Sequence, residues 1–393
     1  MAVPAALVIV PLGILVICSG TLVNFLQAVF FVLVRPLSKS MYKRINKGTA
    51  ELLWLELIWF IDWWAAIKVE LYTDSETFQF MGKENALVIS NHKGDIDWLV
   101  GWVLAQRSGC LGSSVAIMRK EAKFLPIIGW SMWLSDYIFL ETKWDKDEVK
   151  LKSGFQQLED FPMPFWLALF VEGTRFTQPK LAVAQHYAAS RGLPIPKNVL
   201  IPRTKGFVSA VSYMRSFVPA IYDCTVTTSK NQHPPTLLSM FRGETSVVKV
   251  QLKRFLMHEL PETDDGIAQW CRDIFVTKDA LLEKYFTKDT FSDLEHHKIG
   301  RPKKSLIVVI SWSCLIVCGY VKLFQWLSVF SSWEGTAFSV AVLVLVTIVI
   351  QILICAYESE LFTPNGLPLQ DPIRQALIQN YAEIPYSAQP VIM

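Results

Sequence analysis

The stretch VISNHKGDIDW, residues 88–98, carries an imidazole and a carboxylate, His92 and Asp97, separated by four residues. An imidazole can take up and return a proton near neutral pH, and a neighbouring carboxylate can fix its tautomer. The pair is therefore suited to general base catalysis. Because a histidine followed by an aspartate also occurs by chance, it becomes informative only beside a second signal.

Geometry limits the elements that can carry this pair. On a regular helix a spacing of five residues rotates the second side chain by roughly 140° from the first, so His92 and Asp97 are not expected to share one helix. We predict a buried strand over residues 86–90, a turn over 91–94, and a helix with Asp97 in its first turn.

A second polar loop follows an apolar run in FVEGTRFT, residues 170–177, and contains Glu172, Gly173, Thr174 and Arg175. Glycine lets a backbone approach a ligand closely, and the arginine fork matches phosphate oxygens. The loop indicates a phosphate-binding site. The alternative is an ordinary surface turn in which Arg175 pairs with Glu172.

The composition is typical of a membrane protein. Of the 393 residues 52% are hydrophobic, including 14 Trp and 24 Phe, and the mean hydropathy is +0.31. A net charge of +3 without a basic stripe argues against nucleic acid as a partner. The seven cysteines show no CxxC spacing, so neither a disulfide framework nor a zinc site is indicated.

Apolar runs at both ends predict membrane helices. Residues 1–35 form an N-terminal transmembrane anchor, which we interpret as one crossing rather than a re-entrant pair. Residues 305–357 form a transmembrane hairpin, and residues 358–393 a flexible cytosolic tail. The basic residues that follow the anchor place the chain after Arg35 on the cytosolic side.

Between the anchor and the central domain, residues 36–68 combine a basic segment with a Trp-rich helix over 51–68. Clustered tryptophans beside acidic residues favour a helix lying along the membrane interface, and the alternative is a buried core helix. Residues 69–304 form the cytosolic-facing domain. Continuous apolar runs over residues 86–90, 113–118, 165–173, 198–202 and 216–225 predict strands covered on both faces, and hence an α/β domain whose mixed sheet is flanked by helices.

The two polar loops, NHKGDID and EGTR, lie about eighty residues apart, each at the end of a predicted strand. Together they resemble the glycerolipid acyltransferase superfamily. Further blocks resemble the plant microsomal lysophosphatidic acid acyltransferases (1-acyl-sn-glycerol-3-phosphate acyltransferases): KEAKFLPIIGW, VLIPRTKGF and VPAIYDCT. The resemblance implies transfer of an acyl group from coenzyme A to the sn-2 hydroxyl of lysophosphatidic acid at the endoplasmic reticulum membrane, with the active site on the cytosolic face of a multi-pass protein.

The resemblance also implies roles for individual residues. His92 is the general base and Asp97 orients it. Arg175 holds the substrate phosphate, Glu172 and Thr174 shape its loop, and Gly173 with its neighbouring amides, or the turn around Asn91, donates hydrogen bonds to the oxyanion. Two residues of VLIPRTKGF follow: Lys205 as a phosphate or coenzyme A contact, and Pro202 in shaping the acyl-donor site. Arg119 and Lys120 are either further contacts or residues of a surface helix. The implied chemistry requires no metal, and acyl-CoA counts as a co-substrate rather than a cofactor.

Two other classes of function stay open. One is a related acyltransferase with another acceptor, glycerol 3-phosphate or a different lysophospholipid, which acceptor competition would identify. The other is a non-catalytic membrane protein that binds lipid, against which the presence of both His92 and Asp97 argues. The sequence does not indicate an oligomeric state.

One departure from the family pattern generates a prediction. The family usually places an arginine after the residue matching Glu141, where this chain has Thr142 followed by Lys143. Threonine supplies no charge, and lysine supplies a point charge without a fork. We expect weaker binding of the phosphate substrate with the chemistry retained. Thr142→Arg should lower the apparent KM for lysophosphatidic acid in an acyl transfer assay, and an unchanged KM would refute the idea.

Overall fold

The computed structural model describes residues 5–327 except 142, 230–233, 289–290 and 292–293, together with several separate residues between 333 and 345. Thr142, most of the second helix of the predicted hairpin and the predicted tail at 358–393 lie outside the described residues.

Among the described residues, eight strands form one sheet in the order β4-β3-β5-β2-β6-β7-β1-β8. Strand β2 pairs parallel with β5 and β6, whereas β6 and β7 pair antiparallel, so the expected mixed sheet is confirmed. The strands are β1 (Lys68–Thr73), β2 (Ala86–Ser90), β3 (Ser114–Arg119), β4 (Ile138–Leu140), β5 (Trp166–Leu169), β6 (Ala220–Thr228), β7 (Val247–Leu256) and β8 (Glu295–His297).

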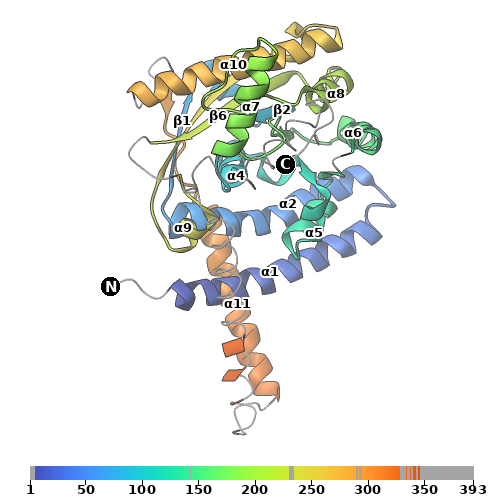
Figure 1. The fold of residues 1–393 in the computed structure, drawn as a ribbon. Helices are drawn as coiled ribbons and strands as arrows, with labels where there is room; N and C mark the ends of the chain where they lie inside the picture. Colours follow the sequence, from blue (N-terminus) through green and yellow to red (C-terminus); the bar gives the residue numbers. More distant parts are fainter. Residues whose placement is uncertain are drawn as a thin grey trace.

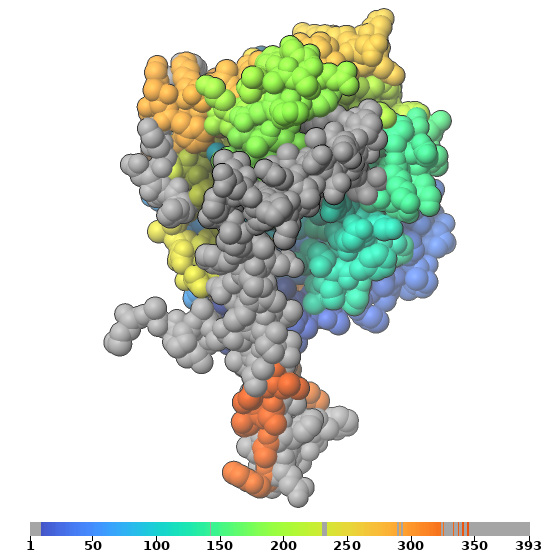
Figure 2. Space-filling model, in the orientation of Figure 1, coloured from blue at the N-terminus to red at the C-terminus, as the bar shows by residue number. Residues whose placement is uncertain are grey.

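Helices lie on both faces of this sheet and beneath it (Figure 1). They are α1 (Ala5–Leu33), α2 (Lys39–Trp59), α3 (Ser75–Phe80), α4 (Asp97–Arg107), α5 (Ile128–Leu134), α6 (Trp144–Glu159), α7 (Gln178–Ser190), α8 (Thr204–Met214), α9 (Leu237–Phe241), α10 (Asp264–Lys288) and α11 (Lys304–Leu327). In the space-filling view α7 stands out from the face shown, beside residues of α10 (Figure 2).

Alternation along β6 assigns two of these helices to opposite faces of the sheet. Asp223 contacts Lys278 of α10, whereas the next residue, Cys224, lines a cavity with Trp98 of α4. Successive side chains of a strand point to opposite faces, so α10 covers one face and α4 the other. Trp102 of α4 packs against Trp54 of α2, with ring centroids 4.3 Å apart.

Four of the five predicted strands are present, and the fifth prediction, over residues 198–202, is wrong. The backbone N–H groups of Asn198 and Val199 donate to the Asp279 carboxylate of α10, at 2.6 and 3.2 Å, instead of to a neighbouring strand. The apolar side chain of Leu200 packs against Leu181 of α7 in a small separate core. Side-chain capping and local packing thus replace the sheet ladder in this segment.

The predicted Trp-rich helix is the second half of α2, which begins in the basic segment and ends in a π-helical turn at Phe60–Trp64. Leu53, Trp54 and Ile58 are at most 1% exposed. This burial favours the alternative of a core helix, because a helix at the membrane interface would keep one apolar side uncovered. The division of the chain at residues 68 and 304 stays a prediction.

Helix α1 is joined to the sheet domain by polar side chains at both ends of α5. The Asn24 side-chain amide donates to the Ile127 carbonyl at 3.0 Å, and the Gln27 amide donates to Ser135 Oγ at 3.4 Å and to Asn46 Oδ1 at 2.9 Å. Buried amides need such partners. One side of α1 is therefore covered by protein.

Two helices are long and apolar enough to cross a membrane, by length and composition: Ile9–Leu33 within α1 and Lys304–Leu323 within α11. Figure 1 shows α1 and α2 side by side beneath the sheet domain, and α11 leading away from it past α1. Apolar side chains on α11 such as Ile307, Leu315 and Val317 are exposed. These features are consistent with membrane association.

A buried acid between α1 and α2 makes stability depend on pH. Glu56 accepts a hydrogen bond from Ser19 Oγ at 2.8 Å, while its other oxygen has no hydrogen-bond partner among the described residues. Burial raises its pKa from 4.5 to about 8. The folded protein therefore holds a proton that the unfolded chain releases, so the contribution of Glu56 to stability is full below pH 4.5 and is lost as the pH rises through about 8.

Glu56→Gln should remove this loss. We expect a higher melting temperature than wild type at about pH 8, corresponding to a few kcal/mol as an order of magnitude, and a smaller difference at about pH 5. Thermal unfolding in detergent at both pH values measures it. Glu76→Gln, at a side chain that is 71% exposed, is the control. Equal pH dependence in wild type and Glu56→Gln would contradict the prediction.

Candidate active site

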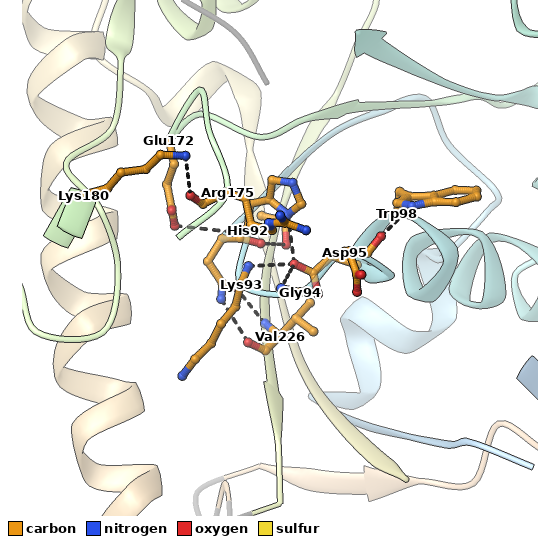
Figure 3. A network of polar contacts seen from close by, with 12 residues as sticks. His92, Lys93, Gly94, Asp95, Trp98, Glu172, Arg175, Lys180 and Val226 are labelled. Atoms are coloured by element: carbon orange, nitrogen blue, oxygen red, sulfur yellow. Dashed lines mark hydrogen bonds and ion pairs between the residues drawn. The ribbon is translucent and has the colours of Figure 1, made fainter. Parts of the chain in front are cut away.

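His92 lies in the turn that follows β2, and Asp97 is the first residue of α4, as the sequence predicts. His92 Nδ1 is 3.0 Å from Asp97 Oδ2, and the same oxygen accepts the backbone N–H groups of Lys93 at 2.7 Å and Gly94 at 2.8 Å (Figure 3). With Nδ1 donating to the carboxylate, Nε2 is the nitrogen available to accept a proton.

The backbone of this turn is fixed from both sides. The Asn91 side chain donates to the Val226 carbonyl at 2.9 Å and accepts the Val226 N–H at 2.8 Å, so it extends the pairing of β2 with β6. The His92 carbonyl accepts the Phe176 N–H at 2.7 Å. The ring of His92 is thus held on a turn that has little freedom to move.

Glu172 joins the two polar loops. It follows β5 and is 2% exposed, and its Oε1 accepts the His92 backbone N–H at 3.4 Å. Burial raises its pKa well above the ordinary value, while the Lys278 ammonium and the His92 N–H act in the opposite direction. The contact excludes the alternative of an ordinary surface turn, because this carboxylate points into the protein.

The rest of this loop is shaped by a glycine and a lysine. Gly173 has φ +68°, a conformation that favours glycine, and its N–H donates to the Phe170 carbonyl at 3.0 Å. The Gly173 amide itself is therefore engaged within the turn, and its neighbouring amides and the turn around Asn91 stay predicted oxyanion donors. Lys180 Nζ contacts Thr174 Oγ1 at 2.5 Å and the Arg175 carbonyl at 3.1 Å (Figure 3).

Cationic side chains gather around this loop. Lys180 lies in the first turn of α7, after Thr177 caps the helix. Burial lowers its pKa, and the charges of Arg175, Arg119 and Arg203 lower it further. We call these four residues the cation cluster. Like charges repel one another. A bound anion would therefore reduce the repulsion among these four side chains.

Sequence reasoning missed two members of the cation cluster, Lys180 and Arg203. Arg203 lies in VLIPRTKGF, and its N–H donates to the Val171 carbonyl at 2.7 Å, which ties this segment to the end of β5. Lys180 follows the helix cap Thr177 by three residues, and that spacing is the signal that could have found it. Arg119 was already a candidate.

Two predicted residues have other surroundings. Pro202 lines a separate pocket of about 600 Å³ between residues 193–202 and α10. Lys205 is exposed, and its ammonium lies 5.4 Å from the centre of the Trp144 ring of α6. The structure does not bring either side chain into contact with His92 or Asp97.

An apolar cavity lies beside Asp97 on the α4 side of the sheet; its empty space is about 870 Å³, part of it open to solvent. It reaches from Asp97 and Phe170 to Met118 and Met132, and the Phe170 ring lies 4.6 Å from the imidazole. An apolar lining of this kind suits a hydrocarbon group. The imidazole therefore lies beside a residue that lines this cavity, and the His92 carbonyl is hydrogen-bonded to the loop that carries Arg175.

Comparison with known proteins gives the family of the chain. The chain matches the Acyltransferase family model over residues 67–229 and the Acyltransferase C-terminus model over residues 239–312. It is 65% identical to 1-acyl-sn-glycerol-3-phosphate acyltransferase 3 of Arabidopsis thaliana, across 96% of this chain and 100% of that protein. Identity to acyltransferase 2 of the same plant is 62%, with 92% of each chain covered. The human gamma enzyme is 36% identical, across 78% of this chain and 80% of that protein. The chain therefore belongs to the family of 1-acyl-sn-glycerol-3-phosphate acyltransferases.

Proposed function

We propose that this acyltransferase transfers an acyl group from acyl-CoA to the sn-2 hydroxyl of lysophosphatidic acid and so forms phosphatidic acid. The observation that carries the proposal is that the His92–Asp97 pair adjoins both the apolar cavity, which Asp97 lines, and the loop of Arg175, whose Phe176 N–H donates to the His92 carbonyl. The acceptor needs a site for its phosphate and the acyl donor a site for its hydrocarbon chain, and the reacting hydroxyl lies between them. The relatives are named for this acceptor.

In the proposed reaction His92 Nε2 accepts the proton of the substrate hydroxyl as its oxygen attacks the thioester carbonyl. Asp97 stabilises the imidazolium that forms. The tetrahedral intermediate then expels the coenzyme A thiolate, which takes the proton from the imidazolium. The hydroxyl itself is the nucleophile, so no covalent bond to the enzyme is formed.

The cation cluster is the proposed phosphate site. The planar guanidinium of Arg175 can donate two hydrogen bonds to a phosphate. Lys180 Nζ fixes the loop by donating to Thr174 Oγ1 and to the Arg175 carbonyl. The phosphate would also approach the N-terminus of α7, where backbone N–H groups point outward. Lys180 therefore acts both as a charge and as a support for Arg175.

The proposed location is the endoplasmic reticulum membrane, with several crossings and the active site on the cytosolic face. Support comes from the two apolar helices and from the basic residues between α1 and the sheet domain. Both substrates carry acyl chains that reside in lipid while their charged ends stay in water, so a site close to the bilayer serves both.

His92→Ala should abolish the reaction with little change in stability. We expect acyl transfer from labelled oleoyl-CoA to 1-acyl-glycerol 3-phosphate to fall by about 10²–10⁴-fold, the usual contribution of a general base. Membranes with equal amounts of each variant provide the measurement. His186→Ala, at an exposed histidine of α7, is the matched control. Full activity of His92→Ala would overturn the assignment, and activity of wild type only on another lysophospholipid or glycerol 3-phosphate would change the acceptor.

Lys180→Met should weaken acceptor binding. We expect the KM for lysophosphatidic acid to rise roughly tenfold, which corresponds to about 1.4 kcal/mol, with a smaller change in the KM for acyl-CoA. Lys152→Met, at an exposed lysine of α6, should leave both constants unchanged. If Lys180→Met raised both KM values equally, the proposed phosphate site would be in the wrong place.

A further inference from the structure

Several large apolar side chains are exposed where the sheet domain meets α1. They come from the 3₁₀-helix η3 (Lys120–Phe124), from the residue after it, and from α5. Phe124 is 73% exposed, and Leu125, Trp130 and Trp133 are exposed as well. A cluster of exposed apolar side chains usually marks a site that contacts a partner or a membrane. Together with Lys123 of η3, we call these residues the η3–α5 surface.

The buried side of α5 contributes to the apolar cavity beside the candidate active site. Met132 of α5 is buried and lines that cavity, together with Met118 of β3. Trp130 and Trp133 are exposed and lie outside its lining. Side chains three residues apart lie on one side of a helix, so the two tryptophans form the outer side of α5. The helix is therefore a wall between the cavity and the η3–α5 surface.

The η3–α5 surface adjoins α1, one of the two helices that are long and apolar enough to cross a membrane. Figure 1 shows α5 beside α1, and the Trp133 ring lies 5.4 Å from the Phe31 ring of α1. Phe25, Val32 and Leu33 of α1 are exposed. The exposed apolar side chains of the two helices therefore belong to one region of the molecule. A membrane that covers α1 would also reach the η3–α5 surface.

Two cations flank the aromatic rings where α5 meets α1. Lys123 Nζ lies 4.8 Å from the centre of the Trp133 ring, and the guanidinium carbon of Arg35 lies 4.6 Å from the centre of the Phe31 ring. Tryptophan and basic side chains gather at membrane–water boundaries, where the rings lie at the level of the headgroups and the cations attract anionic lipids. An apolar protein groove would desolvate these charges without pairing them. The combination therefore favours a lipid bilayer as the occupant.

The corner between η3 and α5 is fixed by contacts with the rest of the fold. Ile127 has φ +68°, a conformation that is rare for a β-branched residue and persists only where its surroundings impose it. Its carbonyl accepts the Asn24 side-chain amide of α1 at 3.0 Å. Gly129 allows α5 to approach η3 closely, because a Cβ there would collide with the Ala122 carbonyl. The exposure of Phe124 is therefore a consequence of a corner that α1 and η3 hold in place.

We propose that the η3–α5 surface inserts into the headgroup boundary of a lipid bilayer and holds the α5 wall of the apolar cavity against that bilayer. An acyl chain then passes from lipid to the cavity along α5 without crossing water. The use of the cavity for an acyl chain rests on the proposed function, whereas the insertion of the surface does not. The interfacial tryptophans are thus Trp130 and Trp133, in place of the buried Trp-rich stretch at 51–68.

Spin-label accessibility tests the insertion without any activity. The full chain carries one label, at Phe124→Cys or at the control Val149→Cys, an apolar side chain of α6 that is 69% exposed. Measurements are made in nanodiscs of phosphatidylcholine and phosphatidylglycerol. We expect the label at 124 to collide more with oxygen, which concentrates in lipid, than with a water-soluble nickel complex, and the label at 149 to do the reverse. Equal access of the nickel complex to both labels, or access of neither reagent to 124, would overturn the proposal in favour of water or a protein partner. The remaining cysteines outside the buried core are replaced by serine in both variants: Cys18, Cys314, Cys318 and Cys355.

A kinetic test uses Phe124→Ser in proteoliposomes of the same lipids, with Val149→Ser as the matched control. Because the Phe124 side chain is mostly exposed, its loss should leave the melting temperature unchanged. We expect kcat/KM to fall roughly fivefold with oleoyl-CoA and to change less with hexanoyl-CoA, whose short chain needs no contact with lipid. Val149→Ser should change neither value.

The kinetic outcomes distinguish this inference from the proposed function. An equal loss with both donors, or no loss with either, would refute passage of the acyl chain from lipid along α5. Inactivity of wild type with every donor and acceptor, while the label at 124 lies in lipid, would refute the proposed function alone.

Discussion

One carboxylate oxygen, Asp97 Oδ2, accepts hydrogen bonds from the His92 ring and from the backbone of Lys93 and Gly94. A buried carboxylate is tolerated only where donors surround it, and here the donors are the turn that carries the catalytic candidate. The turn folds around the carboxylate, and the carboxylate begins α4, where the helix dipole favours a negative charge. The spacing of five residues is therefore the length of chain needed to leave β2, wrap one oxygen and enter a helix.

The parts of the fold that could be predicted are those in which local pattern and tertiary role agree. β2 is a short apolar run bounded by polar turn residues, and α4 starts at an acid that favours a helix N-terminus. Residues 198–202 are as apolar as β2. Their backbone N–H groups nevertheless donate to Asp279, about eighty residues later, and not to a neighbouring strand. No feature local to that segment reveals a partner so distant in the chain.

The same reason explains which site residues were found. His92, Asp97 and Glu172 stand within short motifs, whereas Lys180 and Arg203 join the cation cluster only because α7 and the segment before α8 fold back over the end of β5. The interior position of Trp54 and Glu56 was also hidden, because a Trp-rich stretch with acids is equally compatible with a membrane surface. Whether these two side chains are buried depends on packing against α1, α4 and α11, and the sequence of the stretch alone does not reveal that packing.

The sheet also shows that the two family-model matches are not separate units. Strand β7, from the C-terminal match, lies between β6 and β1, so residues before and after the active-site loops alternate across one sheet. The sheet is continuous only when β7 is paired between β6 and β1. The C-terminal segment therefore contributes to the stability of the whole domain. Truncation after residue 229 would therefore expose the edges of both β6 and β1.

The polar contacts of α1 have a consequence for the order of events during synthesis. Asn24 and Gln27 find their partners Ile127 and Ser135 more than one hundred positions later, at separations of 103 and 108 residues. An emerging α1 therefore lacks these two partners until α5 has been synthesised, although Asn24 also donates to the Gly20 carbonyl of its own helix and Gln27 to Asn46 of α2. The packing of α1 against both ends of α5 is therefore a late step, which is completed only after residues 127–135 have been synthesised.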